Sequence, residues 1–483
     1  MSLGKAAKRP QAVTHVHALD SLLLAAFKDP AILGPTAARG ANSFEALSAI
    51  ATAAVALAAQ KGPEAALLHL AALNKALADV PDCRAWPAVR RVIVAALALR
   101  THRHGPLSPA AESQAAQLLQ RLYFAHILSA QRKGVVEFTH VSRSGGTTFC
   151  QLAQRNGCST EDFRHKENCL IEAFDDAPRY VDLAVHNALR PPGVATRCDD
   201  MAKGVAPRAQ EVSCGERRSA LRRAGHSVYS NEYTAVGGAE HPAHAHHCGN
   251  MLTVLQVRHP HARVVSHIKH MWHAYSKRCK GDRDVYFEGG RDAETWGRLL
   301  PAAMNNYLIR SMLGEAAFRL PVGAITREHL ELARVFLAQQ MNVILVLEEA
   351  RLSFHSLRYG LGWWDFLEHA NSAPADTAEG VPASLELLWE RNALDVELYD
   401  FAAVMAAGDA VVYDVAAAMA ARAGVAPQDA PAWLVQQAVV AARAEKGGEA
   451  AHTGGEVAHT GGDELSEDDY DYGEDEKPGG DVA

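Results

Sequence analysis

Two short runs of β-branched and aromatic residues, at 135–141 and 251–257, are each followed by a turn and then by a helical pattern. Strands that alternate with helices in this way are typical of a parallel sheet covered by helices. Shorter runs at 227–230 and 343–347 supply two further candidate strands. The expected fold is therefore α/β, with a P-loop-like parallel sheet flanked by helices over residues 132–445.

The residues that precede the first strand have the pattern of helices. Apolar residues recur there at helical spacing, and alanine, the strongest helix former, dominates. We interpret residues 1–131 as an all-helical packing or accessory region without chemistry of its own. The helical stretches are expected at 19–27, 44–59, 65–77 and 115–128, with Gly-Pro pairs at 62–63 and 105–106 between them.

The C-terminal stretch, 446–483, contains a near-repeat, AHTGGEVAHTGGDE, and almost no apolar side chains. It cannot offset the entropy of ordering, so we expect a disordered acidic tail. The net charge of the 483-residue chain is −8, but residues 447–483 hold twelve acidic side chains and one lysine, which leaves the body mildly basic. This balance argues against general nucleic-acid binding and suits a small anionic ligand. Tyr470 and Tyr472 lie among the acidic residues, where a solvated tail is favoured over a sulfated one.

The loop and helix start at 140–149 have the composition of an anion-binding cradle. Adjacent glycines allow a tight turn that exposes N–H groups, and the following helix adds partial positive charge at its N-terminus. The lysine of a Walker A loop is absent, and a plain Gly-Gly turn with a threonine cap is the alternative. The residues expected to hold an anion are Arg143, Ser144, Gly145, Gly146, Thr147 and Thr148.

A second strand–turn–helix unit follows the run at 251–257. Arg258 stands at the strand end, and Pro260 suits the first turn of a helix. Ser266 lies about two turns into that helix. Arg258 and Ser266 are therefore expected to converge on one phosphate, although an ordinary strand-end arginine and helix serine would look the same.

Together the two units resemble the 5′-phosphosulfate loop and the 3′-phosphate motif of sulfotransferases that use 3′-phosphoadenosine 5′-phosphosulfate (PAPS). Residues 142–147 match the first motif, with Arg143 where the family usually has lysine. Arg258, Pro260, Arg263 and Ser266 occupy the four named positions of the second motif.

Later stretches at 306–310 and 391–399 look like segments of the membrane-type, carbohydrate-acting branch of this family. The RKGxxG loop of the cytosolic branch is missing. The resemblance extends over about 132–402. It implies transfer of a sulfuryl group from PAPS to a hydroxyl of a carbohydrate acceptor, without a required metal.

The resemblance also implies roles for individual residues. Arg143 would neutralise charge on the leaving phosphate, and the loop around it would hold the 5′-phosphate, while Arg258 and Ser266 would hold the 3′-phosphate. Related enzymes use a glutamate or histidine as the general base, for which Glu232 is the first candidate and His186 the second. The substitution of arginine for lysine at 143 puts the catalytic rate in question more than cofactor binding.

Two other functions stay open at this point: a P-loop-like nucleotide kinase or hydrolase, and a catalytically weak nucleotide-binding relative. The histidine-rich stretch 240–248 and the histidines at 267, 270 and 273 are candidate zinc ligands, but a solvated or phosphate-adjacent role is favoured.

The family suggests a Golgi location and membrane association, yet neither a signal peptide nor a membrane span is visible in the sequence. Seven of the eight cysteines lie between Cys150 and Cys279, which permits disulfides without requiring them.

Overall fold

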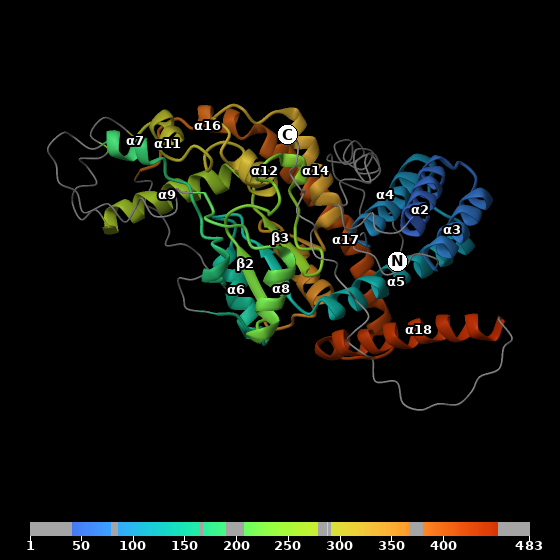
Figure 1. The fold of residues 1–483 in the computed structure, drawn as a ribbon. Coiled ribbons are helices and arrows are strands. Elements are labelled where there is room, and N and C mark those ends of the chain that lie inside the picture. The colour runs from blue at the N-terminus through green and yellow to red at the C-terminus, as the bar shows by residue number, and fades with distance from the viewer. Residues whose placement is uncertain are drawn as a thin grey trace, which may run out of the picture. The chain divides into compact units, whose positions relative to one another are not determined.

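The computed structural model describes residues 41–78, 86–161, 163, 168–189, 207–278, 287, 291–366 and 380–452 (Figure 1). Residues 1–438 form one compact unit, and residues 439–483 are a second unit. The helix expected at 19–27 and the stretch 453–483 of the predicted tail lie outside the described residues.

The described part of the N-terminal region is helical, as predicted. Its last helix shows how the sequence sets the boundaries: the Ser108 side chain accepts a hydrogen bond from the N–H of Ala111, and Gly134 ends the helix with a φ of 64°. The region adds one helix, α4, to those expected from the sequence. Its helices are α2 (Ala41–Ala59), α3 (Pro63–Ala78), α4 (Trp86–His104) and α5 (Pro109–Lys133).

Four parallel strands form the sheet, and each overlaps a run predicted from the sequence. Their spatial order is β2-β1-β3-β4. All neighbouring strands pair in parallel, with Phe138 opposite Val254 and Ser230 at the centre of the sheet. The prediction of a parallel α/β sheet is confirmed. The strands are β1 (Val136–Thr139), β2 (Val228–Asn231), β3 (Leu252–Val257) and β4 (Val343–Val346).

The two faces of the sheet have different cores because side chains alternate along each strand. On one face, Phe138 of β1 and Val254 of β3 pack against Phe149, which lies on the helix that follows β1. On the other face, Tyr229 of β2 contacts Phe174 and Leu221. Both faces are therefore covered, as a parallel sheet requires.

The remaining helices lie after β1, β2, β3 and β4, as the alternating pattern predicts. Short 3₁₀ turns occur at Glu172–Phe174, Pro242–His244 and Pro427–Asp429, and a π-helical turn at Leu357–Leu361. The helices are α6 (Gly146–Arg155), α7 (Leu183–Ala188), α8 (Cys214–Arg223), α9 (Pro260–Arg278), α11 (Ala293–Leu299), α12 (Tyr307–Met312), α13 (Gly314–Phe318), α14 (Arg327–Gln340), α15 (Ala350–Ser356), α16 (Glu386–Arg391), α17 (Ala393–Arg422) and α18 (Ala430–His452).

Helix α17 joins the N-terminal helices to the sheet. It packs against β4 and α14 on one side and against α4 and α5 on the other. Its buried Asp409 accepts hydrogen bonds from Arg90 at 2.8 Å and from Arg91 at 2.9 Å, both on α4. The N-terminal region predicted as a separate accessory stretch therefore shares buried ion pairs with the domain that carries the sheet.

Helix α17 is also the one helix in the described ranges that is long and apolar enough to cross a membrane. In its most apolar window of 18 residues, 44% of the residues are buried. The buried residues recur every three or four positions, from Asp395 through Asp409 to Ala420. That spacing gives one apolar stripe, which is the pattern of a helix packed into a protein core.

Two disulfides connect described cysteines. Cys150 on α6 is bonded to Cys169, and Cys214 on α8 is bonded to Cys248. Cys158 is a free, half-buried thiol, and burial raises its pKa to about 11. In the sequence, the first disulfide precedes β2 and the second connects segments before and after β2.

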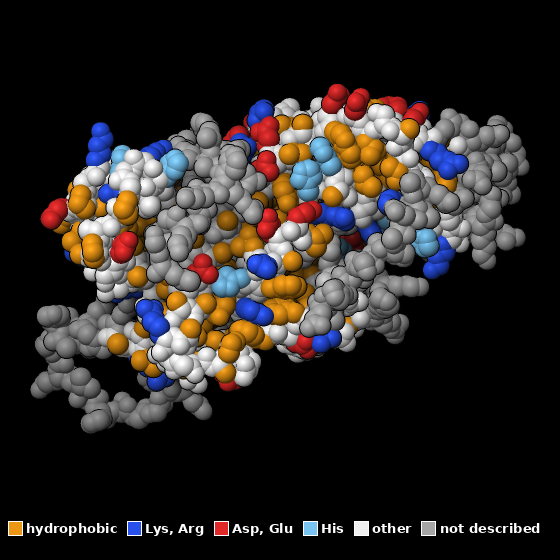
Figure 2. Space-filling model, turned by 180° about the vertical axis from the view of Figure 1, so that it is seen from behind, with side chains coloured by type: hydrophobic (Ala, Val, Ile, Leu, Met, Phe, Trp, Pro, Cys, Tyr) orange, Lys and Arg blue, Asp and Glu red, His pale blue; other side chains and the backbone are white. Residues whose placement is uncertain are grey.

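The predicted start of the tail, residue 446, falls inside α18, which continues to His452. The helix therefore extends beyond the boundary expected from the sequence, and the rest of the predicted tail lies outside the described residues. Figure 2 shows one face of the molecule, on which lysine and arginine side chains lie in separate groups among hydrophobic, acidic and histidine side chains.

Candidate functional site

The carboxyl ends of β1 and β3 lie at the point where the strand order of the sheet reverses. The next strand in the sequence, β2, is added on one side of β1, and β3 and β4 are added on the other side of β1. In open α/β sheets, ligands bind outside the carboxyl ends of the strands at such a switch point. The two loops singled out from the sequence, after Thr139 and after Val257, lie at this point.

The loop after β1 is tight and depends on its glycines. Gly145 has a φ of 93°, a conformation that side chains disfavour, and α6 begins at the next residue. A Cβ on Gly146 would lie 1.9 Å from Nε2 of His140, and one on Gly145 would lie 2.5 Å from Nε2 of Gln256. The first N–H groups of α6 are therefore presented at the carboxyl edge of the sheet, where they suit an anion.

Gly146→Ala is expected to lower the free energy of unfolding by ~1–3 kcal/mol, because the new methyl group would overlap the buried ring of His140. Urea unfolding monitored by circular dichroism measures the change. The matched control is Gly215→Ala in α8, where a Cβ would meet nothing within 4 Å. The control should be neutral or stabilising by up to ~1 kcal/mol, and an equal loss in both variants would contradict the packing argument.

Two arginines and a serine meet beside this loop. Nε of Arg143 donates to Oγ of Ser266 at 3.3 Å, and a terminal nitrogen of Arg143 lies 3.4 Å from Nδ1 of His270. Arg258 donates to the carbonyl oxygen of Arg143 at 3.0 Å. The structure thus brings Arg143, Arg258 and Ser266 together, as their positions in the sequence led us to expect.

The Arg143 and Arg258 guanidinium groups are not paired with a carboxylate in the described part of the chain. Within the described residues, neither Arg143 nor Arg258 forms an ion pair with aspartate or glutamate. Burial lowers the pKa of both side chains, and the nearby carboxylates of Glu232 (at Arg143) and Glu348 (at Arg258) act in the opposite direction, while the charge of Arg143 lowers the pKa of Arg258 further. Neither carboxylate is within ion-pair distance of these guanidinium groups, so two positive charges are available to attract an anion beside the glycine loop.

Two buried polar atoms near the loop also have no partner in the described part of the chain: Oγ of Ser144 and Nε2 of His267. Nδ1 of His267 faces a terminal nitrogen of Arg263 at 3.5 Å, and arginine can only donate, so Nε2 carries the proton of the neutral ring. Burial lowers the pKa of His267 well below its usual value. Both atoms are therefore hydrogen-bond donors that a bound anion would satisfy.

Glu232, the first residue after β2, lies at the same loop and is 5% exposed. Its Oε1 accepts a hydrogen bond from Oγ of Ser142 at 2.9 Å, and its Oε2 accepts one from Nδ2 of Asn168 at 2.9 Å. Nδ1 of His140 lies 3.3 Å from Oε2. A carboxylate that the sequence placed only on a loop is thus adjacent to the candidate anion site.

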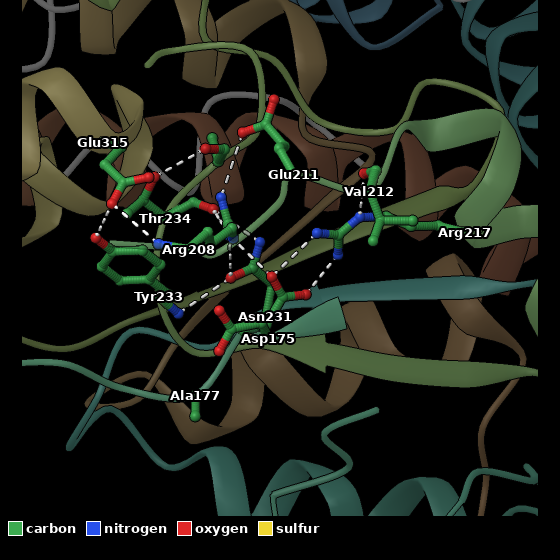
Figure 3. Close-up of polar contacts among 12 residues, drawn as sticks. Asp175, Ala177, Arg208, Glu211, Val212, Arg217, Asn231, Tyr233, Thr234 and Glu315 are labelled. Atoms are coloured by element: carbon green, nitrogen blue, oxygen red, sulfur yellow. Dashed lines mark hydrogen bonds and ion pairs between the residues drawn. The ribbon is translucent and has the colours of Figure 1, made fainter. Parts of the chain in front are cut away.

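A buried polar cluster holds the chain in place after β2 (Figure 3). The N–H of Glu232 donates to the carbonyl oxygen of Asp176 at 3.1 Å, and Asn231 accepts from the N–H of Tyr233 at 3.0 Å. The carboxylate of Asp176 in turn pairs with the buried Arg208 and Arg217. The backbone next to Glu232 is therefore fixed on both sides.

His186, the second candidate base, has a different environment. It lies on α7, and its Nδ1 is 2.8 Å from the hydroxyl of Tyr275. Tyr275 is ~2.5 turns beyond Ser266 on α9, and its ring packs against Phe287. The structure therefore places His186 in an aromatic cluster along α9 and does not bring it to the loop with Arg143.

The two threonines of the loop lie in the first turn of α6, and both are half-buried. The hydroxyl of Thr147 donates to Oδ1 of Asn168 at 2.8 Å. To donate to a phosphate, the Thr147 hydroxyl has to give up its hydrogen bond to Asn168.

The later stretches that the family resemblance singled out contact each other. Asp395 on α17 accepts hydrogen bonds from the N–H groups of Leu308 at 2.8 Å and Ile309 at 3.0 Å, and so caps α12. Tyr399, one turn further along α17, donates to Glu348 at 3.0 Å, which also accepts from the N–H of His259. These contacts attach α17 to the loop that follows β3.

No group of three or more histidine, cysteine, aspartate or glutamate side chains that could hold a metal occurs in the part of the chain described here. In the histidine-rich stretch, His247 is buried between Thr139 and Glu137, and His241 caps a 3₁₀ turn. These histidines have structural contacts within the described residues.

Several residues at the site were not identified from the sequence. His140 follows β1 directly, so its position carried a usable signal, whereas the sequence marks His267 only as a candidate zinc ligand or as a phosphate-adjacent histidine. Asn168 comes from the irregular segment between β1 and β2, and nothing local marks it. No protein-family model, curated protein or solved structure matches this chain.

Proposed function

We propose that the protein transfers a sulfuryl group from PAPS to a hydroxyl group of a carbohydrate acceptor. The observation that carries the proposal is the pair Arg143 and Arg258, two arginines in contact at the switch point of a parallel sheet that form no ion pair with a carboxylate in the described part of the chain. The glycine loop and the unpartnered hydroxyl of Ser144 provide further donors for an anion. A P-loop-like nucleotide site with this donor set suits the 5′- and 3′-phosphates of PAPS.

Each residue has a role in this proposal. The N–H groups of Gly145 and Gly146, with Ser144, Thr147 and Thr148, bind the 5′-phosphate, and Arg258 and Ser266 bind the 3′-phosphate. Arg143 faces the leaving phosphate and neutralises the charge that develops there. Because Arg143 contacts Ser266 and Arg258, a single network of donors serves both phosphates.

Glu232 is the general base of the proposed reaction. The acceptor oxygen attacks sulfur, the bond between sulfur and the 5′-phosphate oxygen breaks, and the acceptor proton passes to the Glu232 carboxylate. We prefer Glu232 to His186 because Glu232 shares hydrogen bonds with Ser142 in the loop, whereas His186 bonds to Tyr275.

Two measurements test the proposal. Calorimetry compares the affinity for 3′-phosphoadenosine 5′-phosphate (PAP), the desulfated product, with the affinity for ATP. Transfer of radiolabelled sulfate from PAPS to a panel of glycans then measures turnover. Preference for ATP would favour a nucleotide kinase or hydrolase, and PAP binding without turnover would favour a catalytically weak relative.

Arg258→Ala is expected to weaken PAP binding about tenfold or more, since a hydrogen bond from a charged group contributes ~1.5–3 kcal/mol. Calorimetry on the variant measures the loss. Arg222→Ala is the matched control, because Arg222 is an exposed arginine in the last turn of α8. If both variants bind PAP like the unmodified protein, the assignment of the 3′-phosphate site is wrong.

We also propose that the protein works in an oxidising compartment such as the Golgi lumen, as the family resemblance suggests. The disulfides Cys150–Cys169 and Cys214–Cys248 support this location, since such bonds persist in secretory compartments and are rare in the cytosol. Thiol alkylation of protein from its native source, with and without reduction, tests this.

A further inference from the structure

Asn168 makes two side-chain hydrogen bonds that run in opposite directions. Its Oδ1 accepts from the hydroxyl of Thr147 at 2.8 Å, in the first turn of α6. Its Nδ2 donates to Oε2 of Glu232 at 2.9 Å, at the end of β2. One amide group thus connects the candidate anion loop with the candidate base.

The backbone of Asn168 is fixed to the same two elements. The next residue, Cys169, is bonded through its disulfide to Cys150 on α6. On the other side, the N–H of Ser230 in β2 donates to the carbonyl oxygen of Cys169 at 2.8 Å, and the Ser230 hydroxyl donates to the carbonyl oxygen of Asn168. The amide is therefore held between α6 and β2 by covalent and hydrogen bonds.

We propose that Asn168 is a positioning residue that links the nucleotide loop to Glu232. The inference rests on the proposed function for its catalytic consequence. When a phosphate accepts a hydrogen bond from the hydroxyl of Thr147, Oδ1 of Asn168 loses its donor. The amide that orients the Glu232 carboxylate therefore responds to occupancy of the loop.

This role requires an amide, because the side chain must accept a hydrogen bond from Thr147 and donate one to Glu232. An aspartate at this position would still accept from Thr147, but it would repel Glu232 when both carboxylates are charged. When protonated, the aspartate would recover a donor for Glu232. Asn168→Asp is therefore expected to show a pH signature that Asn168→Ala lacks.

Steady-state turnover with PAPS tests the catalytic part. Asn168→Ala should lower kcat about tenfold or more at every pH. Asn168→Asp should lower kcat by the same factor near pH 8. Its kcat relative to that of the unmodified protein should be at least about threefold higher near pH 6 than near pH 8, because protonation of one carboxylate removes the repulsion. Asn74→Ala, which removes a half-buried amide that bridges α3 and α5, should leave kcat unchanged. Identical pH profiles for the two Asn168 variants would overturn the proposal.

A double-mutant cycle tests the link without turnover. Thr147→Val and Glu232→Gln are combined in the unliganded protein, and urea unfolding is measured with Asn168 and with Asn168→Ala. When Asn168 is present, the effect of the double variant on the unfolding equilibrium constant should differ about threefold or more from the product of the two single effects. When alanine replaces Asn168, the effects of Thr147→Val and Glu232→Gln should be additive in free energy. Additivity in both backgrounds would overturn the link. Failure of PAP binding would instead remove the proposed function, and the cycle would still decide the role of Asn168.

Discussion

Glu232→Gln is expected to lower kcat for sulfuryl transfer by ~10²–10⁴-fold, the usual contribution of a general base. Glutamine has almost the same shape and can still accept from Ser142 in the loop, although its amide nitrogen cannot accept the hydrogen bond that Asn168 donates to the carboxylate. The affinity for PAP should therefore change little, while turnover is lost. The expected result is a large fall in kcat with a nearly unchanged nucleotide dissociation constant.

Glu240→Gln provides the matched control, because Glu240 is an exposed glutamate in the loop that follows β2. It should leave both constants unchanged. Full turnover in Glu232→Gln would remove Glu232 as the base. A loss of PAP affinity as large as the loss of kcat would show that the residue maintains the site instead of accepting a proton.

Asp409→Ala is expected to lower the free energy of unfolding by ~3–5 kcal/mol, because it leaves Arg90 and Arg91 charged and unpaired in the protein interior. Both arginines are 2% exposed, so water cannot replace the lost carboxylate. Such a change is a large part of the ~5–15 kcal/mol by which a typical protein is stable. Urea unfolding monitored by tryptophan fluorescence measures it.

The pH dependence of stability follows from the same pair. Burial opposes ionisation of Asp409, but the charges of Arg90 and Arg91 hold its pKa below the usual value. A lowered pKa means that this stabilisation is present above about pH 3.9, the usual aspartate value, and is lost as the pH falls through the lowered one. In the Asp409→Ala variant this part of the acid sensitivity should be absent.

Asp414→Ala is the control for this prediction, since Asp414 lies on the same helix with a side chain that is 72% exposed and lies 3.1 Å from His355. Exposed pairs contribute ~0–1 kcal/mol. A loss in Asp409→Ala no greater than that in Asp414→Ala would contradict the buried role of the arginine pair.

The strands and the two loops could be predicted because their signals are local. The β-branched run before His140 and the glycine pair after Ser144 lie within a dozen residues of each other, and backbone chemistry alone requires a turn there. The proximity of Arg258 to that loop followed from parallel pairing, since carboxyl ends of parallel strands share one edge.

The contacts of Arg90 and Asn168 could not be predicted in the same way. Arg90 lies in a helical pattern in which a charged residue would ordinarily face water, and its partner Asp409 is more than 300 positions away. Asn168 reaches Glu232 because of a disulfide and a strand contact, neither of which has a local sequence signature. Long-range packing, and not local propensity, decides where such polar side chains lie.

The disulfide between Cys150 and Cys169 has a practical consequence. Both cysteines are almost fully buried, at 3% and 0% exposure, so a thiol reagent in solution can reach the bond only when the protein opens locally. A chain that folds in a reducing environment, by contrast, would never acquire the bond that fixes Asn168. Specific activity would then depend on the redox conditions during folding. Two preparations of identical sequence and purity that folded under different redox conditions would differ in rate when assayed in one buffer.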